Sequence, residues 1–210
     1  GTPMSTQKIA ARLNVSRTPV REAFIRLQRD GLVEIFPQKE TIVSRIDFSK
    51  VEQERFVRES LECANLHLLI NKISNEDIKE LELNLEQQKS TVNNSSNDEL
   101  IKLDNAFHEY MFKITGQKFS WETIEKTSNH YSRIRNLTAW DKDIMLETIK
   151  QHENIFNAVK EKNINQAEIF IKSHLHRLEN QLHKLLEDYP DYFVKESIPS
   201  EQMFEALLRQ

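Results

Sequence analysis

Four side chains of the types that bind metal ions occur at spacings that could bring them together. Asp104 and His108 are four residues apart, so a helix would present a carboxylate and an imidazole one turn apart on one face. His152 and His174 each continue the apolar stripe of a later helical segment. One carboxylate and three imidazoles would then point inward from three helices. A shared divalent cation would satisfy all four groups.

The same pattern has a second interpretation, in which each histidine is an ordinary core residue. A buried imidazole needs a polar partner, and a backbone or side-chain oxygen is sufficient. Periodicity alone leaves both interpretations open for the set of four. His176 and His183 fall off the inward face, so we expect them at the surface, and spacing assigns no particular role to His67 or His130.

The segments that carry these residues are predicted to be helices. The chain has 3 Gly and 5 Pro among 210 residues, too few for the tight turns of a β-sandwich or barrel. The remaining composition favours helices, and we expect a mainly α protein. From residue 51 to 187 the helical period predicts an antiparallel bundle. The expected helices are 51–71, 75–92, 97–115, 119–138, 142–161 and 164–187.

The first part of the chain, residues 1–47, has a different pattern of two short helices. Ser5 is expected to cap a helix that runs to Leu13. Ser16 is expected to cap a second helix, which a glycine at position 31 would end. Two helices joined by a turn of two or three residues have helix-turn-helix geometry.

The start of the second helix carries residue types that read DNA. Arg17 and Arg21 leave the same helix face, and arginine can bind guanine through two parallel hydrogen bonds. Ser16 and the N–H groups of the helix N-terminus suit phosphates. Two β-branched runs, 32–35 and 41–43, then predict a hairpin, or wing. A small helical bundle without a DNA role is the alternative, but the order of these features favours a winged helix-turn-helix.

The charge distribution separates the two parts of the chain. The net charge is −4 overall, yet residues 1–46 carry +4 and the remainder −8. This asymmetry places any DNA binding in the first part. Cys63 is the only cysteine, which excludes a disulfide scaffold and a cysteine-based zinc site and fits a reducing cytoplasm. No apolar run approaches the length of a membrane span.

The segment from Ile9 to Ala23 resembles the signature of the GntR family of bacterial winged-helix repressors, and residues 27 and 30–33 continue the resemblance. The family's usual first helix does not precede it here, and Gly1–Met4 resembles the loop that follows that helix. Glu40 stands where the family usually has a glycine in the wing. Position by position, the resemblance implies that operator DNA is contacted by Ser16, Arg17, Thr18 and Arg21.

Residues 51–187 resemble the FCD ligand-binding domain of the FadR subfamily, which is all-helical. That domain has an Asp-x-x-x-His motif followed by one histidine in each later helix. The resemblance therefore implies a divalent metal, Zn, Ni or Mn, held by Asp104, His108, His152 and His174. Arg58–Glu62 also resembles the family's Arg-x-x-Leu-Glu motif, whose arginine projects into the effector cavity in relatives.

Four protein ligands leave coordination positions open on the metal, where a small organic acid could place a carboxylate oxygen. Arg58 would pair the charge of this acid, because guanidinium matches carboxylate in a two-pronged geometry. Arg133 is a further candidate effector ligand, as is Arg135, although solvated surface charge explains both equally well.

These features together predict a metabolite-responsive transcriptional regulator, a repressor that acts as a homodimer on palindromic double-stranded operator DNA. A metal-dependent enzyme acting on a small carboxylate is the alternative, because the same ligand set serves metalloenzymes. No general base or nucleophile accompanies the cluster, however. A non-specific DNA-packaging protein is a third class, and it conflicts with the acidic second part. Residues 188–210 are a predicted extension in which Ser200 caps an amphipathic helix, 201–208.

Overall fold

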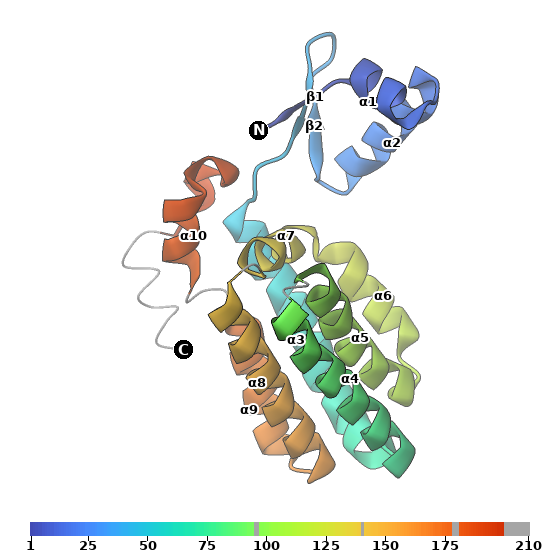
Figure 1. Cartoon of the computed structure of the whole chain (residues 1–210), viewed down its shortest axis with the longest axis vertical. Coiled ribbons are helices and arrows are strands. Elements are labelled where there is room, and N and C mark those ends of the chain that lie inside the picture. Colours follow the sequence, from blue (N-terminus) through green and yellow to red (C-terminus); the bar gives the residue numbers. More distant parts are fainter. Residues whose placement is uncertain (95–96, 140, 178–180, 200–210) are drawn as a thin grey trace.

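The computed structural model places a small winged module, residues 1–47, at one end of a helical bundle (Figure 1). It describes residues 1–94, 97–139, 141–177 and 181–199. The chain is mainly α, as predicted. Within these ranges, no helix has the length and apolar character needed to cross a bilayer.

The winged module begins with a helix-turn-helix, α1 (Thr6–Leu13) and α2 (Arg17–Arg29). The Ser5 hydroxyl accepts a hydrogen bond from a backbone N–H of the first turn of α1, as predicted. Ser16 stands at the N-cap position of α2 but forms no capping hydrogen bond, so the prediction of a side-chain cap there is wrong. Gly31 has φ +71° just after α2, a conformation in which glycine is unstrained, and it ends the helix as predicted.

The wing is a three-stranded antiparallel sheet. Strands β2 (Val33–Ile35) and β3 (Thr41–Val43) form the predicted hairpin. Strand β1 (Pro3–Met4) pairs with the other side of β3, which gives the order β1-β3-β2. The sequence did not predict β1, because two residues are too short to show an alternating pattern. Val20 and Phe24 of α2 are buried in the small core of this module.

The second part is built from helices, and most expected bounds are close to those observed. The predicted segment 119–138 is two helices, because the chain bends at Ser128, whose hydroxyl donates back to the Ile124 carbonyl at 2.6 Å. The predicted segment 164–187 is also divided. The observed helices are α3 (Phe48–Lys72), α4 (Asn75–Asn94), α5 (Asn97–Thr115), α6 (Lys118–Thr127), α7 (Asn129–Thr138), α8 (Lys142–Lys160), α9 (Ile164–His176) and α10 (Leu182–Asp188).

Helix α3 is the central element of the bundle. It packs against α5, α6, α7, α8 and α9, while α4 pairs with α5 and α8. Leu69, Phe107 and Ile155 are fully buried in the main core between these helices. Polar side chains that project into this core from α5, α8 and α9 are therefore removed from water, which sets the electrostatics of the site described below.

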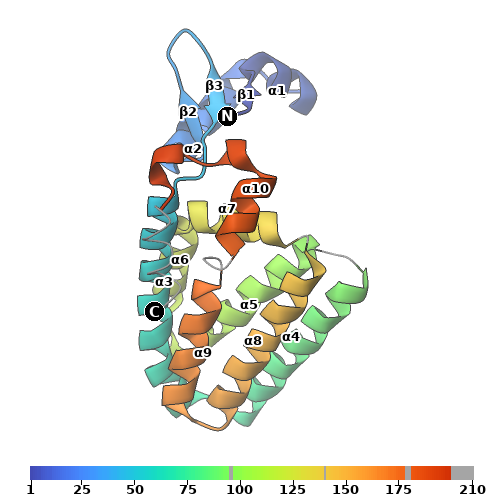
Figure 2. The ribbon, with the colours of Figure 1, turned by 90° about the vertical axis from the view of Figure 1, so that its left-hand side faces the viewer.

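The segment after α10 lies against the linker that joins the winged module to the bundle (Figure 2). The backbone N–H of Ile46 donates to Tyr192 at 2.8 Å, and that of Val194 donates to the Ile46 carbonyl at 2.9 Å. Phe193, between them, is buried. The predicted extension therefore contacts the DNA-binding part through this segment. The predicted helix 201–208 lies outside the described residues.

Candidate metal centre and DNA-binding face

The four predicted metal ligands come together in the core of the bundle. Asp104 and His108 project from α5, His152 from α8 and His174 from α9, and all four are buried. One ligand atom from each residue lies within 4.8 Å of the others. The Nε2 atom of His152 is 3.4 Å from that of His174 and 3.7 Å from a carboxylate oxygen of Asp104. The predicted convergence of these side chains is thus observed.

Each imidazole is held through its Nδ1 atom by a side-chain oxygen. Because that oxygen accepts a hydrogen bond, Nδ1 carries the proton and Nε2 offers its lone pair to the common point. The buried Nε2 of His108 has no hydrogen-bond partner, and a shared cation would coordinate its lone pair. The donor set therefore fits a metal. The Nδ1···O pairs are His108 with Glu62 at 2.7 Å, His152 with Gln88 at 2.8 Å and His174 with Gln151 at 3.0 Å.

Burial and neighbouring charges give the cluster the protonation state that a divalent cation requires. Burial lowers the pKa of His152 to about 3 and holds the pKa of His174 well below its ordinary value, so both rings are neutral near pH 7. Burial opposes ionisation of Asp104, but Arg135 and the histidines keep the pKa of its carboxyl well below the usual range. Neutral imidazoles and a carboxylate are ligands for Zn, Ni and Mn.

Arg58 and Glu62 form a buried ion pair directly behind His108. The Nε atom of Arg58 donates to one oxygen of Glu62 at 2.6 Å, and the other oxygen of Glu62 faces His108. Burial opposes ionisation, yet His108 and Arg58 lower the pKa of Glu62 to about 2. The guanidinium lies 5.7 Å from the ring centre of Tyr131, and its Nη2 has no hydrogen-bond partner. Arg58 thus positions Glu62 and has one buried donor that no protein atom accepts.

The two arginines of α7 have different surroundings. Arg135 donates to Asp104 at 2.5 Å, directly at the cluster. Arg133 donates instead to the backbone carbonyl of Ser44, in the linker, at 2.8 Å. The expectation that Arg133 binds the effector is therefore corrected, because residues two apart on a helix point to nearly opposite sides. Of the two, only Arg135 faces the cluster.

Several residues of this centre were not predicted as site residues. Glu62 had a local signal, since it lies one turn after Arg58 on the same helix. Gln88 and Gln151 had none, because each supports a histidine from another helix. Arg177 follows α9 immediately, is buried, and donates to the hydroxyl of Thr148. Only the packing of the helices reveals these partners.

Substitution of Glu62 by glutamine tests the support of His108. We expect the affinity for a divalent metal to fall by about 10- to 100-fold, the usual cost of losing a partner that orients a ligand. Competition with a chromophoric chelator would measure the affinity. Glu59→Gln, on the same helix, removes the same charge from a position that pairs with Arg55 and should bind metal normally. Unchanged affinity in Glu62→Gln would show that Glu62 does not position His108.

The predicted DNA contacts lie on the exposed N-terminal end of α2. Ser16, Arg17, Thr18 and Arg21 are all exposed. Arg17 and Arg21 line a groove between α2 and the wing, together with Lys8, Lys39 and Glu40. The groove has four cationic side chains and one carboxylate, which suits a polyanion.

Comparison with known proteins agrees with both halves of this description. Residues 1–43 match the model of the gntR family of bacterial regulatory proteins, and residues 55–177 match the FCD domain. The chain is also 31% identical over 196 residues to the HTH-type transcriptional repressor RspR of Escherichia coli, an alignment that covers 93% of this chain and 86% of RspR. This chain is a GntR-family transcriptional regulator with an FCD domain.

Other relatives of this GntR regulator align with it over most of its length. A transcriptional regulator from an unstable DNA locus of Streptomyces ambofaciens is 30% identical, and the alignment covers 94% of this chain and 83% of that protein. Among solved structures, E. coli McbR/YncC superposes with a TM-score of 0.72 at 19% identity, covering 90% of this chain and 89% of McbR. That likeness supports the fold. The alternative of a metal-dependent enzyme is not retained, because the family consists of regulators.

Proposed function

We propose that this GntR regulator is a repressor that binds a palindromic operator as a homodimer and responds to a small organic acid. A divalent metal held by Asp104, His108, His152 and His174 would anchor the acid through a carboxylate oxygen. Arg58 would pair the charge of the acid through its unpartnered Nη2. The relative RspR is named a transcriptional repressor, which supports repression as the mode of regulation.

At the operator, one recognition helix α2 from each protomer would enter the major groove of one half-site. Arg17 and Arg21 would read guanines, and Ser16 and Thr18 would contact phosphates. The missing side-chain cap at Ser16 is consistent with this role, because its exposed hydroxyl makes no capping bond within the helix.

The observation that carries the proposal is that helix α7 contacts both the cluster and the recognition helix. At its C-terminal end, Arg135 donates to the candidate metal ligand Asp104. At its N-terminal end, Asn129 donates at 2.8 Å to the carbonyl of Asp30, the residue that caps the end of α2. Figures 1 and 2 both show α7 at the end of the bundle nearest the winged module.

Two further contacts of α7 hold the linker between the parts. The backbone N–H of Asp47 donates to Nδ1 of His130 at 3.1 Å, and Arg133 donates to Ser44. A ligand that changes the contact between Arg135 and Asp104 would therefore move a helix that touches the linker and α2. To change operator affinity, the acid must bind the arrangement that fits the operator and the arrangement that does not with different affinities. Such differences are typically about 1–3 kcal/mol.

Operator binding with and without ligand tests the proposal. The operator is first selected from random duplex DNA, and affinity is measured by fluorescence anisotropy with metal alone, acid alone, both and neither. Candidate acids come from a thermal-shift screen with and without chelator. We expect an acid to stabilise only the metal-loaded protein and to weaken its binding to the operator. An acid effect that survives complete removal of metal would contradict the proposed site.

The contact of α7 with α2 can be tested separately with Asn129→Ala. We expect the variant to bind metal and acid normally but to lose much of the acid-induced change in operator affinity, because one link between the sites is removed. Asn136→Ala is the matched control, since Asn136 lies on the same helix and donates only to the Ser132 carbonyl. An equal response to the acid in wild type and Asn129→Ala would show that this contact does not transmit the signal.

A further inference from the structure

The buried charges around the cluster do not balance. Among the described residues, five buried side chains are arginine or carboxylate: Arg58, Glu62, Asp104, Arg135 and Arg177. Arg58 pairs with Glu62, and Arg135 pairs with Asp104. One guanidinium is left over, and it belongs to Arg177.

Arg177 is a buried cation without an anionic partner in the described part of the chain. It donates to the hydroxyl of Thr148, and its Nε atom has no hydrogen-bond partner. A buried unpaired charge is costly, and proteins normally retain one only where a ligand or ion neutralises it. A divalent cation at the cluster would add two more positive charges to the same region. The excess of buried positive charge therefore rises from one to three. An acid with one carboxylate would neutralise only one of the three.

We propose that the effector carries two anionic groups, one bound at the metal position and the other at Arg177. This inference rests on the proposed function, because it assigns the chemistry of the ligand at the same site. Arg177 would then determine specificity for dicarboxylates over monocarboxylates, since its two-pronged donor geometry matches a second carboxylate.

The cavities beside the cluster support this placement. A small cavity of about 20 Å³ lies against Asp104 and Arg177, and it also includes Arg135 and Thr138 in its wall. This volume holds about one water molecule, so a ligand must extend beyond it. A larger pocket of about 240 Å³ lies next to it and shares Thr138 and Ile144 with the small cavity.

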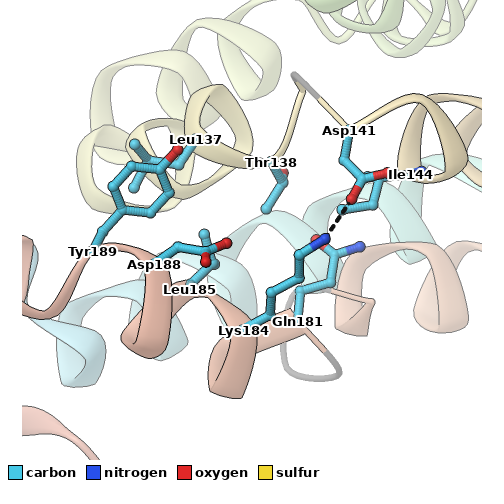
Figure 3. Close-up of a pocket in the computed structure, with 9 residues that line it drawn as sticks. All are labelled: Leu137, Thr138, Asp141, Ile144, Gln181, Lys184, Leu185, Asp188 and Tyr189. Carbon is cyan, nitrogen blue, oxygen red and sulfur yellow. Dashed lines mark hydrogen bonds and ion pairs between the residues drawn. The ribbon is translucent and has the colours of Figure 1, made fainter.

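The larger pocket provides the space and the route that the rest of the acid needs. Residues of α7, α8 and α10 surround it, as Figure 3 shows. Lys184 of α10 pairs with Asp141, just before α8, at 2.6 Å across one side of this pocket. An acid entering here would pass Thr138 and place one carboxylate at the cluster and one at Arg177. The carbon chain that joins the two carboxylates would bridge these two positions, and any longer part of the acid would lie in the larger pocket.

The test compares acids that differ only in the second carboxylate, and it uses the whole 210-residue chain already loaded with metal. The matched pairs are butyrate with succinate, 2-hydroxybutyrate with malate, and valerate with glutarate. Calorimetry and thermal shift measure binding. We expect at least one diacid to bind about tenfold or more tightly than its partner, because a charge-assisted hydrogen bond to a buried guanidinium is gained.

Variants of Arg177 assign that preference to the residue. We expect Arg177→Gln to lose the preference for the diacid while still binding metal, and Arg177→Lys to keep part of it. Lys172→Gln is the matched control, because it removes one positive charge from the exposed surface of α9, the helix that Arg177 follows. Metal uptake and thermal unfolding without acid show whether each variant is folded.

The possible outcomes separate this inference from the proposed function. Equal binding of monoacid and diacid, an unchanged preference in Arg177→Gln, or no binding of any of the six acids to metal-loaded protein would overturn the inference. Failure of the wild-type protein to take up metal would overturn the metal centre of the proposed function. The measurement of metal uptake detects this failure before any acid is added.

Discussion

His152→Ala is expected to lower the affinity for a divalent metal by more than about 100-fold, beyond the usual cost of losing an outer-shell partner. His152 is fully buried, and its Nε2 lies within 4 Å of both the Nε2 of His174 and a carboxylate oxygen of Asp104. Its loss removes one of four ligands and opens the site to water. The metal content of purified protein and chelator competition would measure the effect. Stabilisation by the acid should disappear together with the metal.

His67→Ala is the matched control for this prediction. The His67 side chain is 62% exposed and pairs with Glu168 at the surface, so the variant should bind metal like wild type. His152→Gln keeps a similar volume without the imidazole and separates loss of a ligand from loss of packing against Phe107. If His152→Ala retained wild-type metal content, the four residues would be a polar core cluster and not a metal site.

Arg21→Ala is expected to weaken operator binding by about 1–3 kcal/mol, or about 5- to 150-fold, and to relax the base preference at one position of each half-site. Arg21 is exposed on the first turns of α2, in the groove between this helix and the wing. A contact to a base edge distinguishes sequences, so its loss should affect the matching base pair most. Anisotropy titrations against operators with single base changes would measure both effects.

Arg29→Ala provides the comparison, because Arg29 is exposed at the opposite end of the same helix. From there it can reach only phosphate, so its loss is expected to weaken binding uniformly across sequences and to reduce the salt dependence. Neither effect changes base preference. An Arg21→Ala protein with the base preference of wild type at every position would refute direct reading by Arg21.

The winged module shows how much of this protein can be predicted from local sequence. A serine that caps α1, a glycine that ends α2 and two β-branched runs are short-range signals, and each predicts an element close to where it is observed. The exposed arginines follow from the same helical period. The bundle helices were predicted in the same way, with errors where Ser128 divides a segment and where α10 is separate from α9.

The convergence of the four candidate metal ligands was also accessible from the sequence, because each lies on the apolar stripe of its helix and the stripes must share a core. The sequence also indicates that Arg133 and Arg135 cannot both face the cluster, since a helix points residues two apart to different sides. The partners of the histidines were not accessible from the sequence. Gln88 and Gln151 reach their imidazoles across helix interfaces, where no periodicity of one segment is informative.

The sequence alone thus determined which residue types are present, which helix faces carry them and where the chain turns, because these depend on interactions between near neighbours. The tertiary structure decided which polar groups are paired in the core and which cation, Arg177, is left without a counter-charge. It also decided that α7 joins the cluster to the recognition helix. Such contacts arise when distant segments pack together, and packing is decided by the whole set of helices at once.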